Sequence, residues 1–414
     1  MIYIYRFFYL LLKTLAISLK PFLNAKTQRW IAQRSAVNLG AHSKLNLTQS
    51  IWIHASSGEI EYAKYLILKL NKLAPHFPIV VTYSSESAEK LFDNIRHLVE
   101  AFVPVPWDDV YSQNQFIRKI NPQILIIART DLWPEMLEQC SQQKISIGLI
   151  SYFPKFSKAN RLILKVLLNK FTFISCVDQN TENELKKMRL KKSVQLRQDG
   201  DTRFDQVFAR ISQDSKFKIS TKSKIFTFGS TWPEDELQFD EVFAEIISNQ
   251  HKIILSPHDV SEANLARVYE KLQSKKYSFQ KLSESDSILQ FDTSILVIDR
   301  IGYLADAYRY SQLAFVGGSF KARVHSVMEP LCCGLPVLVG PFIKNSPEAL
   351  KYSQSADQKF VFVSQNAKEL LASYKNLNLS HVAELNQKIK LEMQKNQGAS
   401  ERIAMFISDT LLKK

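Results

Sequence analysis

A carboxylate behind a Ser-Ser-Gly turn is the first group along the chain that could perform catalysis. Glu59 ends the stretch IWIHASSGE, in which an apolar run gives way to Ser56, Ser57 and Gly58. A glycine beside a carboxylate allows a ligand to approach closely, as a general base requires. An acidic residue is also ordinary in the first turn of a helix, where the helix dipole favours it. The stretch alone leaves both interpretations open.

A second polar stretch, ARTDLWP, also follows an apolar run. It contains Arg129, Asp131 and Trp133, and Pro134 is a residue typical of the first turn of a helix. One interpretation is a self-neutralising Arg–Asp pair with the tryptophan in the core. The other is a polar cluster that faces Glu59 from a neighbouring strand end.

Two stretches of the second half carry donors that suit a phosphate. In FGSTWPEDE, Ser230 and Thr231 precede an acidic helix start, which is compatible with helix capping and with a phosphate cradle. In FVGGSFKARVHSVMEP, a Gly-Gly turn and basic residues precede an expected helix, an arrangement that suits a nucleotide phosphate. His325 and Glu329 are four residues apart, so we expect them on one helix face, with Glu329 able to hold ribose hydroxyls. As a metal pair they lack a third ligand.

The elements that position these residues form two series of strands and helices. Apolar runs that end in Gly, Ser, Pro or a charge alternate with helical stretches, which predicts parallel sheets covered on both faces. Two such series in 414 residues predict two doubly wound domains, in which ligands bind beyond the carboxyl ends of the strands. The expected boundaries are an amphipathic helix over 1–30, a first domain over 31–208, a linker over 209–224, a second domain over 225–385 and a final helix over 386–414.

The charge of the chain favours an anionic partner. The net charge is +14, and the first 58 residues supply seven basic side chains and no Asp or Glu, hence +7 of it. Such a segment is suited to a polyanion or an anionic membrane surface. The four cysteines have no metal-ligand spacing, and we expect buried, reduced thiols of a cytoplasmic protein.

The first 23 residues are mostly apolar but are interrupted by charge. Arg6, Lys13 and Lys20 are spaced by seven and therefore lie along one stripe of a helix. This spacing, and the absence of a small-residue cleavage site, argue against a signal peptide or a membrane span. We predict an amphipathic helix in the membrane surface, apolar side in the acyl boundary and basic side toward anionic headgroups. The alternative is a core helix of the first domain.

In collinear order over essentially the whole chain, these motifs resemble the 3-deoxy-D-manno-octulosonic acid (Kdo) transferases of Gram-negative bacteria. The motifs that carry the resemblance are HASSGE, TDLWP, GDTRFD, GSTWPEDE, SPH, IDRIGYLADAYR, FVGGS, H-x-x-x-EP, GLPVLVGP and NQGA. The resemblance implies an α/β glycosyltransferase of the GT-B type, with two Rossmann-like domains facing a central cleft. It implies CMP-Kdo as donor and a lipid A precursor as acceptor, at the cytoplasmic side of the inner membrane. No cofactor, metal or nucleic acid is expected.

The motifs and the resemblance together assign roles to individual residues. Glu59 is the expected general base, with Asp131 as a second catalytic carboxylate. The expected acceptor-binding residues are Ser56, Ser57, Gly58, Arg129 and Trp133. The expected donor-binding residues are Ser230, Thr231, His258, Gly317, Gly318, Ser319, Lys321, Arg323, His325, Ser326 and Glu329.

The chain departs from the family pattern mainly in its first half. The family's Glu-Thr-Glu-Leu-Trp-Pro here begins with Arg129, and its Thr-x-Thr-Gly block, at 82–85, lacks the glycine. The Asn-Ala-Arg-Leu-Ser block has no counterpart around 151–153, and the His-Asn pair of the second half is His325 followed by Ser326. Two alternatives stay open: the same scaffold with a changed lipid acceptor or donor, and a catalytically silent, membrane-bound nucleotide-binding protein.

Overall fold

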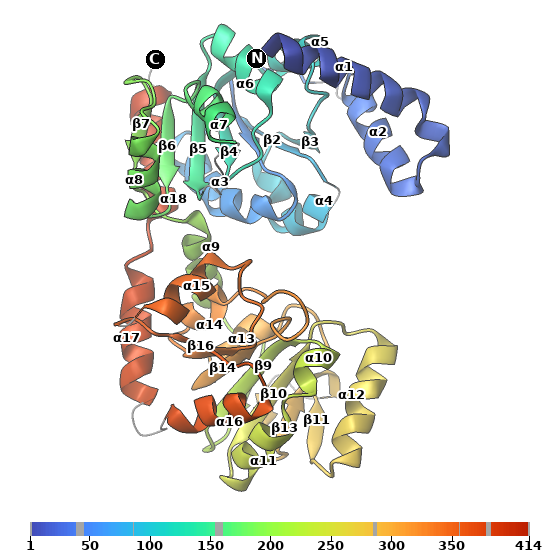
Figure 1. Cartoon of the computed structure of the whole chain (residues 1–414), viewed down its shortest axis with the longest axis vertical. Coiled ribbons are helices and arrows are strands. Elements are labelled where there is room, and N and C mark those ends of the chain that lie inside the picture. The colour runs from blue at the N-terminus through green and yellow to red at the C-terminus, as the bar shows by residue number, and fades with distance from the viewer. Residues whose placement is uncertain are drawn as a thin grey trace. The chain divides into compact units, whose positions relative to one another are not determined.

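The computed structural model describes residues 2–38, 45–85, 87–153, 160–284, 288–355, 357–377 and 382–412. The chain divides into two compact units: Met1–Gln206 together with Asn396–Lys414, and Val207–Lys395. Each unit is built on a parallel sheet with helices on both faces (Figure 1).

The sheet of the first unit has seven parallel strands in the order β3-β2-β1-β4-β5-β6-β7. They are β1 (Ser50–His54), β2 (Ile79–Tyr83), β3 (Ala101–Pro104), β4 (Pro122–Ala128), β5 (Ser146–Tyr152), β6 (Phe173–Cys176) and β7 (Gln195–Arg197). Strand β1 pairs with both β2 and β4, so the winding direction of the chain reverses between β1 and β4. A crevice at such a switch point is the usual ligand site of an open parallel sheet.

Helices pack on both faces of this sheet, which explains why its strands are apolar on both sides. One face is covered by α3 and α18, with Leu66 and Ile403 in the shared core, and the other by α5 and α6, with Phe116 and Leu137. The helices of the unit are α1 (Ile2–Ser18), α2 (Ala25–Asn38), α3 (Ile60–Leu73), α4 (Ser87–Phe92), α5 (Val110–Ile120), α6 (Pro134–Gln142), α7 (Arg161–Leu168), α8 (Gln179–Lys187), α9 (Thr202–Ile211), which runs into the second unit, and α18 (Ala399–Phe406). Shorter helical turns are η1 (Lys20–Phe22), η2 (Ser57–Glu59), η3 (Asp93–Leu98) and η5 (Ile407–Leu411).

The second unit also has a seven-stranded parallel sheet, in the order β11-β13-β10-β9-β14-β15-β16, which differs from the first in that β13 lies between β10 and β11. Its strands are β9 (Ile225–Thr231), β10 (Lys252–Pro257), β11 (Phe279–Lys281), β13 (Ile295–Val297), β14 (Leu313–Val316), β15 (Val337–Val339) and β16 (Val361–Val363), while β8 (Lys218–Ser220) and β12 (Ile288–Gln290) form a separate pair. Its helices are α10 (Pro233–Glu236), α11 (Asp240–Ser248), α12 (Glu262–Ser274), η4 (Leu282–Glu284), α13 (Leu304–Tyr308), α14 (Met328–Cys332), α15 (Pro347–Gln354), α16 (Ala367–Asn376) and α17 (Val382–Gln394). The switch point lies between β9 and β14.

The predicted fold class is confirmed, because two doubly wound α/β sheets are present. The structure differs from the expected boundaries at two places. The segment 209–224, expected as a linker, contains the end of α9 and strand β8. The single helix expected over 386–414 is two helices, which belong to different units.

A left-handed glycine separates these two helices. Gly398 has φ +89, and the backbone N–H groups of Gly398 and Ser400 donate to the Asp205 carboxylate at 2.6 Å each. The chain therefore stops after α17 and begins a new, side-chain-capped helix in the first unit.

The first helix docks on the protein through its polar stripe. Arg6 forms two hydrogen bonds with the buried Glu135, at 2.8 and 2.9 Å, and Lys13 pairs with Asp109 at 2.6 Å. The prediction that these cations face lipid headgroups is therefore wrong for Arg6 and Lys13. None of the side chains of α1 is buried, and Phe7 remains 67% exposed. In the part of the chain that the structure describes, no helix has the length and apolarity needed to cross a bilayer.

Candidate active site

Glu59 lies at the carboxyl end of β1, on the switch point of the first sheet. The chain leaves β1 through η2, with Ser57 in the left-handed region at φ +44, and Glu59 precedes the first residue of α3. Its Oε1 accepts a hydrogen bond from the Thr130 hydroxyl at 2.8 Å. Its Oε2 is buried and has no hydrogen-bond partner among the described residues. The carboxyl group is thus held at one oxygen, while the other is buried without a hydrogen-bond partner among the described residues.

Burial makes this carboxyl group a suitable proton acceptor near neutral pH. Desolvation raises the pKa of Glu59 to about 7, although the hydrogen bond from Thr130 and the charge of Arg129 act in the opposite direction. A base whose pKa lies near the working pH combines a useful ionised fraction with a strong affinity for the proton.

Asp131, at the end of the adjacent β4, is held in the opposite state. Burial raises the pKa of its carboxyl group, but hydrogen bonds outweigh this effect and place the pKa below its ordinary range. Oδ2 lies 3.0 Å from His54 Nε2 and accepts the Ser84 hydroxyl at 2.7 Å. The ionised Asp131 in turn raises the pKa of Glu59. Two carboxyl groups with pKa values driven apart are a pattern typical of acid–base sites.

His54 connects Asp131 to the core of the sheet. Its ring is fully buried in β1, with Nδ1 2.9 Å from the Thr82 hydroxyl, which also accepts the indole N–H of Trp52 at 2.9 Å. Nε2 contacts the Asp131 carboxylate, and the Thr82 hydroxyl bridges Nδ1 and the indole of Trp52, which can only donate. Sequence reasoning missed His54, although a histidine inside an otherwise apolar strand was the available signal.

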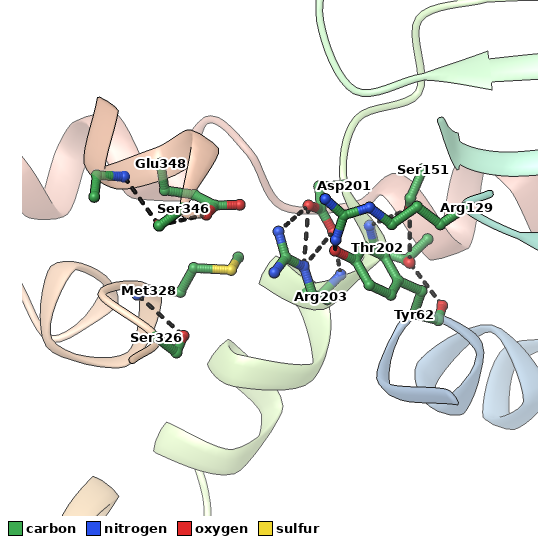
Figure 2. Close-up of polar contacts among 11 residues, drawn as sticks. Tyr62, Arg129, Ser151, Asp201, Thr202, Arg203, Ser326, Met328, Ser346 and Glu348 are labelled. Atoms are coloured by element: carbon green, nitrogen blue, oxygen red, sulfur yellow. Dashed lines mark hydrogen bonds and ion pairs between the residues drawn. The ribbon is translucent and has the colours of Figure 1, made fainter. Parts of the chain in front are cut away.

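Arg129 turns away from Asp131. It has φ +66, its Nη1 donates to the Tyr62 hydroxyl, and its guanidinium carbon lies 5.2 Å from the centroid of that ring (Figure 2). Among the described residues no carboxylate lies within ion-pair distance of Arg129, so the Arg129–Asp131 pair considered from the sequence does not form.

The other residues expected to bind the acceptor have different environments. Trp133 packs against the buried guanidinium of Arg34, at 4.8 Å, which agrees with a core role. Ser56 accepts the backbone N–H of Glu59 at 2.7 Å through its carbonyl oxygen. Gly58 is exposed, and a side-chain carbon added there would meet no atom within 4 Å. Space for a ligand beside Glu59 therefore exists at Gly58.

The motif GDTRFD fixes the start of α9 beside this site. Thr202 donates its hydroxyl to the carbonyl of Tyr62 at 2.6 Å, and its backbone N–H donates to the Ser151 hydroxyl at 3.0 Å (Figure 2). Arg203 forms a bidentate ion pair with Asp201, at 2.7 Å for the shortest contact. The hydrogen bond from Thr202 fixes the backbone carbonyl of Tyr62 and therefore the first turn of α3, which follows Glu59.

In the second unit, the expected phosphate cradle already holds a carboxylate of the protein. The backbone N–H groups of Gly318 and Phe320 donate to Asp235 at 2.7 and 2.9 Å. Ser319 is fully buried and bonds the backbone of β14 and Gly340. The prediction that the Gly-Gly-Ser turn offers free donors to a phosphate is therefore wrong for the N–H of Gly318, which Asp235 of α10 occupies, and the hydroxyl of Ser319 is used within the protein.

Gly317 serves close packing between strands instead. A side-chain carbon at Gly317 would collide with the carbonyl group of Ser230, which itself has a left-handed φ of +54. Burial raises the pKa of Asp235, while the hydrogen bonds that its carboxylate accepts from backbone N–H groups act in the opposite direction.

Two histidines and a tryptophan form a stack at the same strand ends. The ring of His258 stacks on His325 with centroids 4.3 Å apart and on Trp232 at 4.8 Å, and the Trp232 N–H donates to His325 Nε2 at 3.0 Å. Burial lowers the pKa of His325 to about 4, with the neighbouring His258 and Arg323 acting in the same direction. His325 is therefore neutral at pH 7 and carries its proton on Nδ1, where it can donate to a ligand.

The expected pairing of His325 with Glu329 on a helix face is wrong. Helix α14 begins at Met328, so His325 lies in the preceding loop. The Met328 N–H donates to the Ser326 hydroxyl at 3.4 Å. Glu329 accepts from Arg210 at 2.8 Å, so its carboxylate is already paired with a cation.

The remaining donor candidates differ in accessibility. Lys321 lies over the Trp232 ring, with Nζ 3.5 Å from the centroid, and 3.8 Å from Glu234. Thr231 is buried and donates to Glu236 at 3.1 Å. Among the described residues no group of three or more His, Cys, Asp or Glu side chains is placed to hold a metal ion.

Comparison with known proteins places these two units in context. Residues 28–206 match the family model of 3-deoxy-D-manno-octulosonic-acid transferase (kdotransferase). The chain is 25% identical over 396 residues to a bifunctional glycosyltransferase/methyltransferase of Fusobacterium nucleatum, covering 89% of this chain and 58% of that relative's length. It is 25% identical over 351 residues to the 3-deoxy-D-manno-octulosonic acid transferase of Aquifex aeolicus, covering 84% and 90%.

The fold is also similar to that of solved structures. UDP-GlcNAc 2-epimerase from Neisseria meningitidis matches with a TM-score of 0.58 at 15% identity, over 89% of this chain and all of that one. At this identity the likeness shows the fold alone, which is the GT-B arrangement of two Rossmann-like units.

Proposed function

We propose that this chain, which belongs to the Kdo transferase family, transfers Kdo from CMP-Kdo to a lipid A precursor in lipopolysaccharide biosynthesis. The observation that carries the proposal is the pair of carboxyl groups at the β1–β4 switch point. Glu59 has a pKa of about 7 and one unpartnered oxygen, whereas Asp131 is kept ionised by its hydrogen bonds.

In the proposed reaction Glu59 takes the proton of an acceptor hydroxyl. The oxygen freed of that proton forms a bond to the anomeric carbon of Kdo while the bond from this carbon to the CMP phosphate oxygen breaks. The electron pair leaves on the phosphate, and attack opposite the leaving group inverts the anomeric configuration. Lys321, Arg323 and the Nδ1–H of His325 are the groups of the second unit suited to stabilise the departing phosphate. This assignment agrees with the metal-independent chemistry that the resemblance implies.

The proposed site of action is the cytoplasmic side of the inner membrane, to which the chain binds peripherally. The helix α1 supports this, since Arg6 and Lys13 form ion pairs with carboxylates of the protein and the apolar side chains of the helix are exposed. The exposed apolar side chains are those of Tyr3, Ile4, Phe7, Phe8, Leu10, Leu11, Leu12, Leu15 and Ile17. An apolar helix face of this kind is suited to the acyl boundary of a bilayer.

The proposal is tested by incubating purified protein with CMP-Kdo and a lipid A precursor and analysing the lipid by mass spectrometry. We expect the lipid mass to increase by one or more Kdo residues, and no such increase with Glu59→Gln. An unchanged lipid with the native chain would refute the transfer, and full activity of Glu59→Gln would remove the carboxylate from its role. CMP binding without product would instead favour the silent, nucleotide-binding alternative.

A second candidate is transfer to a different anionic lipid. It is favoured by Arg129, which stands where the family has a carboxylate and makes no ion pair with a described carboxylate. A product on another anionic lipid, with none on the lipid A precursor, would distinguish the two.

A further inference from the structure

We propose that Arg129 and Tyr62 form a subsite for a phosphate group of the acceptor, next to the hydroxyl from which Glu59 takes a proton. This inference rests on the proposed function and adds to it the chemical group that the first unit recognises. The evidence lies in the backbone, the contacts and the charge of Arg129.

The backbone directs the guanidinium toward α3 at an energetic cost. Arg129 has φ +66, a conformation that costs a non-glycine residue roughly 1 kcal/mol or more. Its N–H is bonded to the carbonyl of Ile150 at 3.0 Å, which fixes the residue at the end of the sheet. A strained residue at a strand end beside a candidate base indicates a functional constraint.

The contacts of Arg129 orient its guanidinium without neutralising it. Nη1 donates to the Tyr62 hydroxyl, and the same ring has the guanidinium of Arg203 within 4.5 Å of its centroid (Figure 2). Arg203 has Asp201 as its counter-ion, whereas Arg129 has no carboxylate within ion-pair distance among the described residues. An arginine that is oriented by an aromatic ring keeps N–H groups for a bidentate oxyanion.

The nearby carboxyl groups do not serve as this counter-ion. Asp131 is bonded to His54 and Ser84, and burial holds the pKa of Glu59 at about 7, so that much of it is neutral at pH 7. The charge of Arg129 therefore has no carboxylate bonded to it among the described residues. A phosphate near the reacting hydroxyl would balance this charge, and a carboxylate on an already attached sugar acid is a second source of the same oxyanion chemistry.

The experiment measures binding of three lipid acceptors by the native chain and by Arg129→Gln, followed by turnover of the same acceptors with CMP-Kdo. The first acceptor has its phosphates, the second has lost them to a phosphatase, and the third is dephosphorylated but carries one Kdo. Arg189→Gln is the matched control, because Arg189 is an exposed arginine of the same unit and also has a left-handed φ, of +52. Glutamine keeps the side-chain carbons, so both variants retain the same backbone strain.

We expect Arg129→Gln to weaken binding of the phosphorylated acceptor about tenfold or more, the value of a charge-assisted hydrogen bond, and to leave the dephosphorylated acceptor within about twofold. Arg189→Gln should change neither. Equal weakening of all acceptors, together with a shift of the acidic limb of the pH–rate profile, would overturn the proposal and make Arg129 a residue that only tunes Glu59. Selective weakening of the third acceptor would also overturn it, in favour of a carboxylate subsite.

The two proposals fail in different ways. Binding that depends on phosphate and on Arg129 supports the subsite whether or not Kdo is transferred, since binding needs no donor. Turnover with no dependence on Arg129 or on the phosphate would refute the subsite and leave the transferase proposal intact.

Discussion

Replacing Glu59 by glutamine should make the protein more stable while it strongly lowers kcat. In the folded protein the carboxyl group of Glu59 has a pKa of about 7, against 4.5 for an unperturbed glutamate side chain. Because the folded-state pKa is raised, the contribution of this group to stability is present below about pH 4.5 and is lost as the pH rises through 7. The gap corresponds to roughly 3 kcal/mol at high pH.

This reasoning predicts a stability difference that grows with pH. Glutamine is neutral at every pH and keeps the oxygen that accepts from Thr130, so it removes the cost of ionisation. We expect Glu59→Gln to be more stable than the native chain by roughly 1 kcal/mol at about pH 5 and by roughly 3 kcal/mol at about pH 8. The free energy of unfolding is measured by denaturant titration at both pH values. Glu100→Gln, an exposed surface change, is the control and should show little difference.

Kinetics test the same carboxyl group independently. The native chain should lose rate on the acidic side with a midpoint near pH 7, so that kcat/KM at about pH 6 is roughly a tenth of its plateau. Glu59→Gln should lower kcat by roughly 10²–10⁴. If the stability gain were the same at both pH values, or if the acidic limb lay near pH 4.5, the raised pKa would be refuted.

Three further predictions concern the supports of the site. His54→Ala should lower the free energy of unfolding by about 2 kcal/mol or more in denaturant titrations, because Asp131 and Thr82 lose the hydrogen bonds that the ring makes with them. A loss below about 0.5 kcal/mol would contradict the assigned network. Asp235→Asn should weaken CMP binding in calorimetry and destabilise the fold, since an amide offers only one acceptor for two N–H donors, and unchanged binding would mean that this turn does not shape the donor site. Phe7→Ser with Leu11→Ser should reduce binding to anionic vesicles about tenfold or more with an unchanged circular dichroism spectrum, and equal vesicle binding would argue against α1 as the membrane contact.

The fold followed from the sequence because its signals are local and repeated. Continuous apolar runs such as those of β1 and β4 can be buried only between two helix layers, which fixes a parallel sheet. The position of Glu59 followed as well, since strand ends at the switch point are set by strand order. Shorter strands such as β6 and β7 have too few residues to show a pattern.

The failures arise where distant side chains occupy a local motif. The sequence around Gly318 resembles an anion-binding turn, but nothing in it reveals that Asp235, 83 positions earlier, fills that turn. The spacing of His325 and Glu329 suggested one helix, yet α14 begins only at Met328. The stripe of Arg6 and Lys13 suggested a lipid contact because the carboxylates that pair with it lie about 100 residues away in sequence.

The helix α18 makes the two units unequal with respect to proteolysis and expression. The second unit is a continuous stretch, Val207–Lys395, whereas the first is completed only by the last residues of the chain. Ile403, Ala404 and Ile407 are fully buried in the core that they share with α3. A fragment that ends near residue 208 lacks them and would therefore expose the apolar side chains of α3 that they cover. A single cut between the units cannot yield two intact pieces. The segment Asn396–Lys414 must be supplied with the first unit, either fused or as a separate peptide, and a nascent chain cannot complete the first unit until α18 has been synthesised.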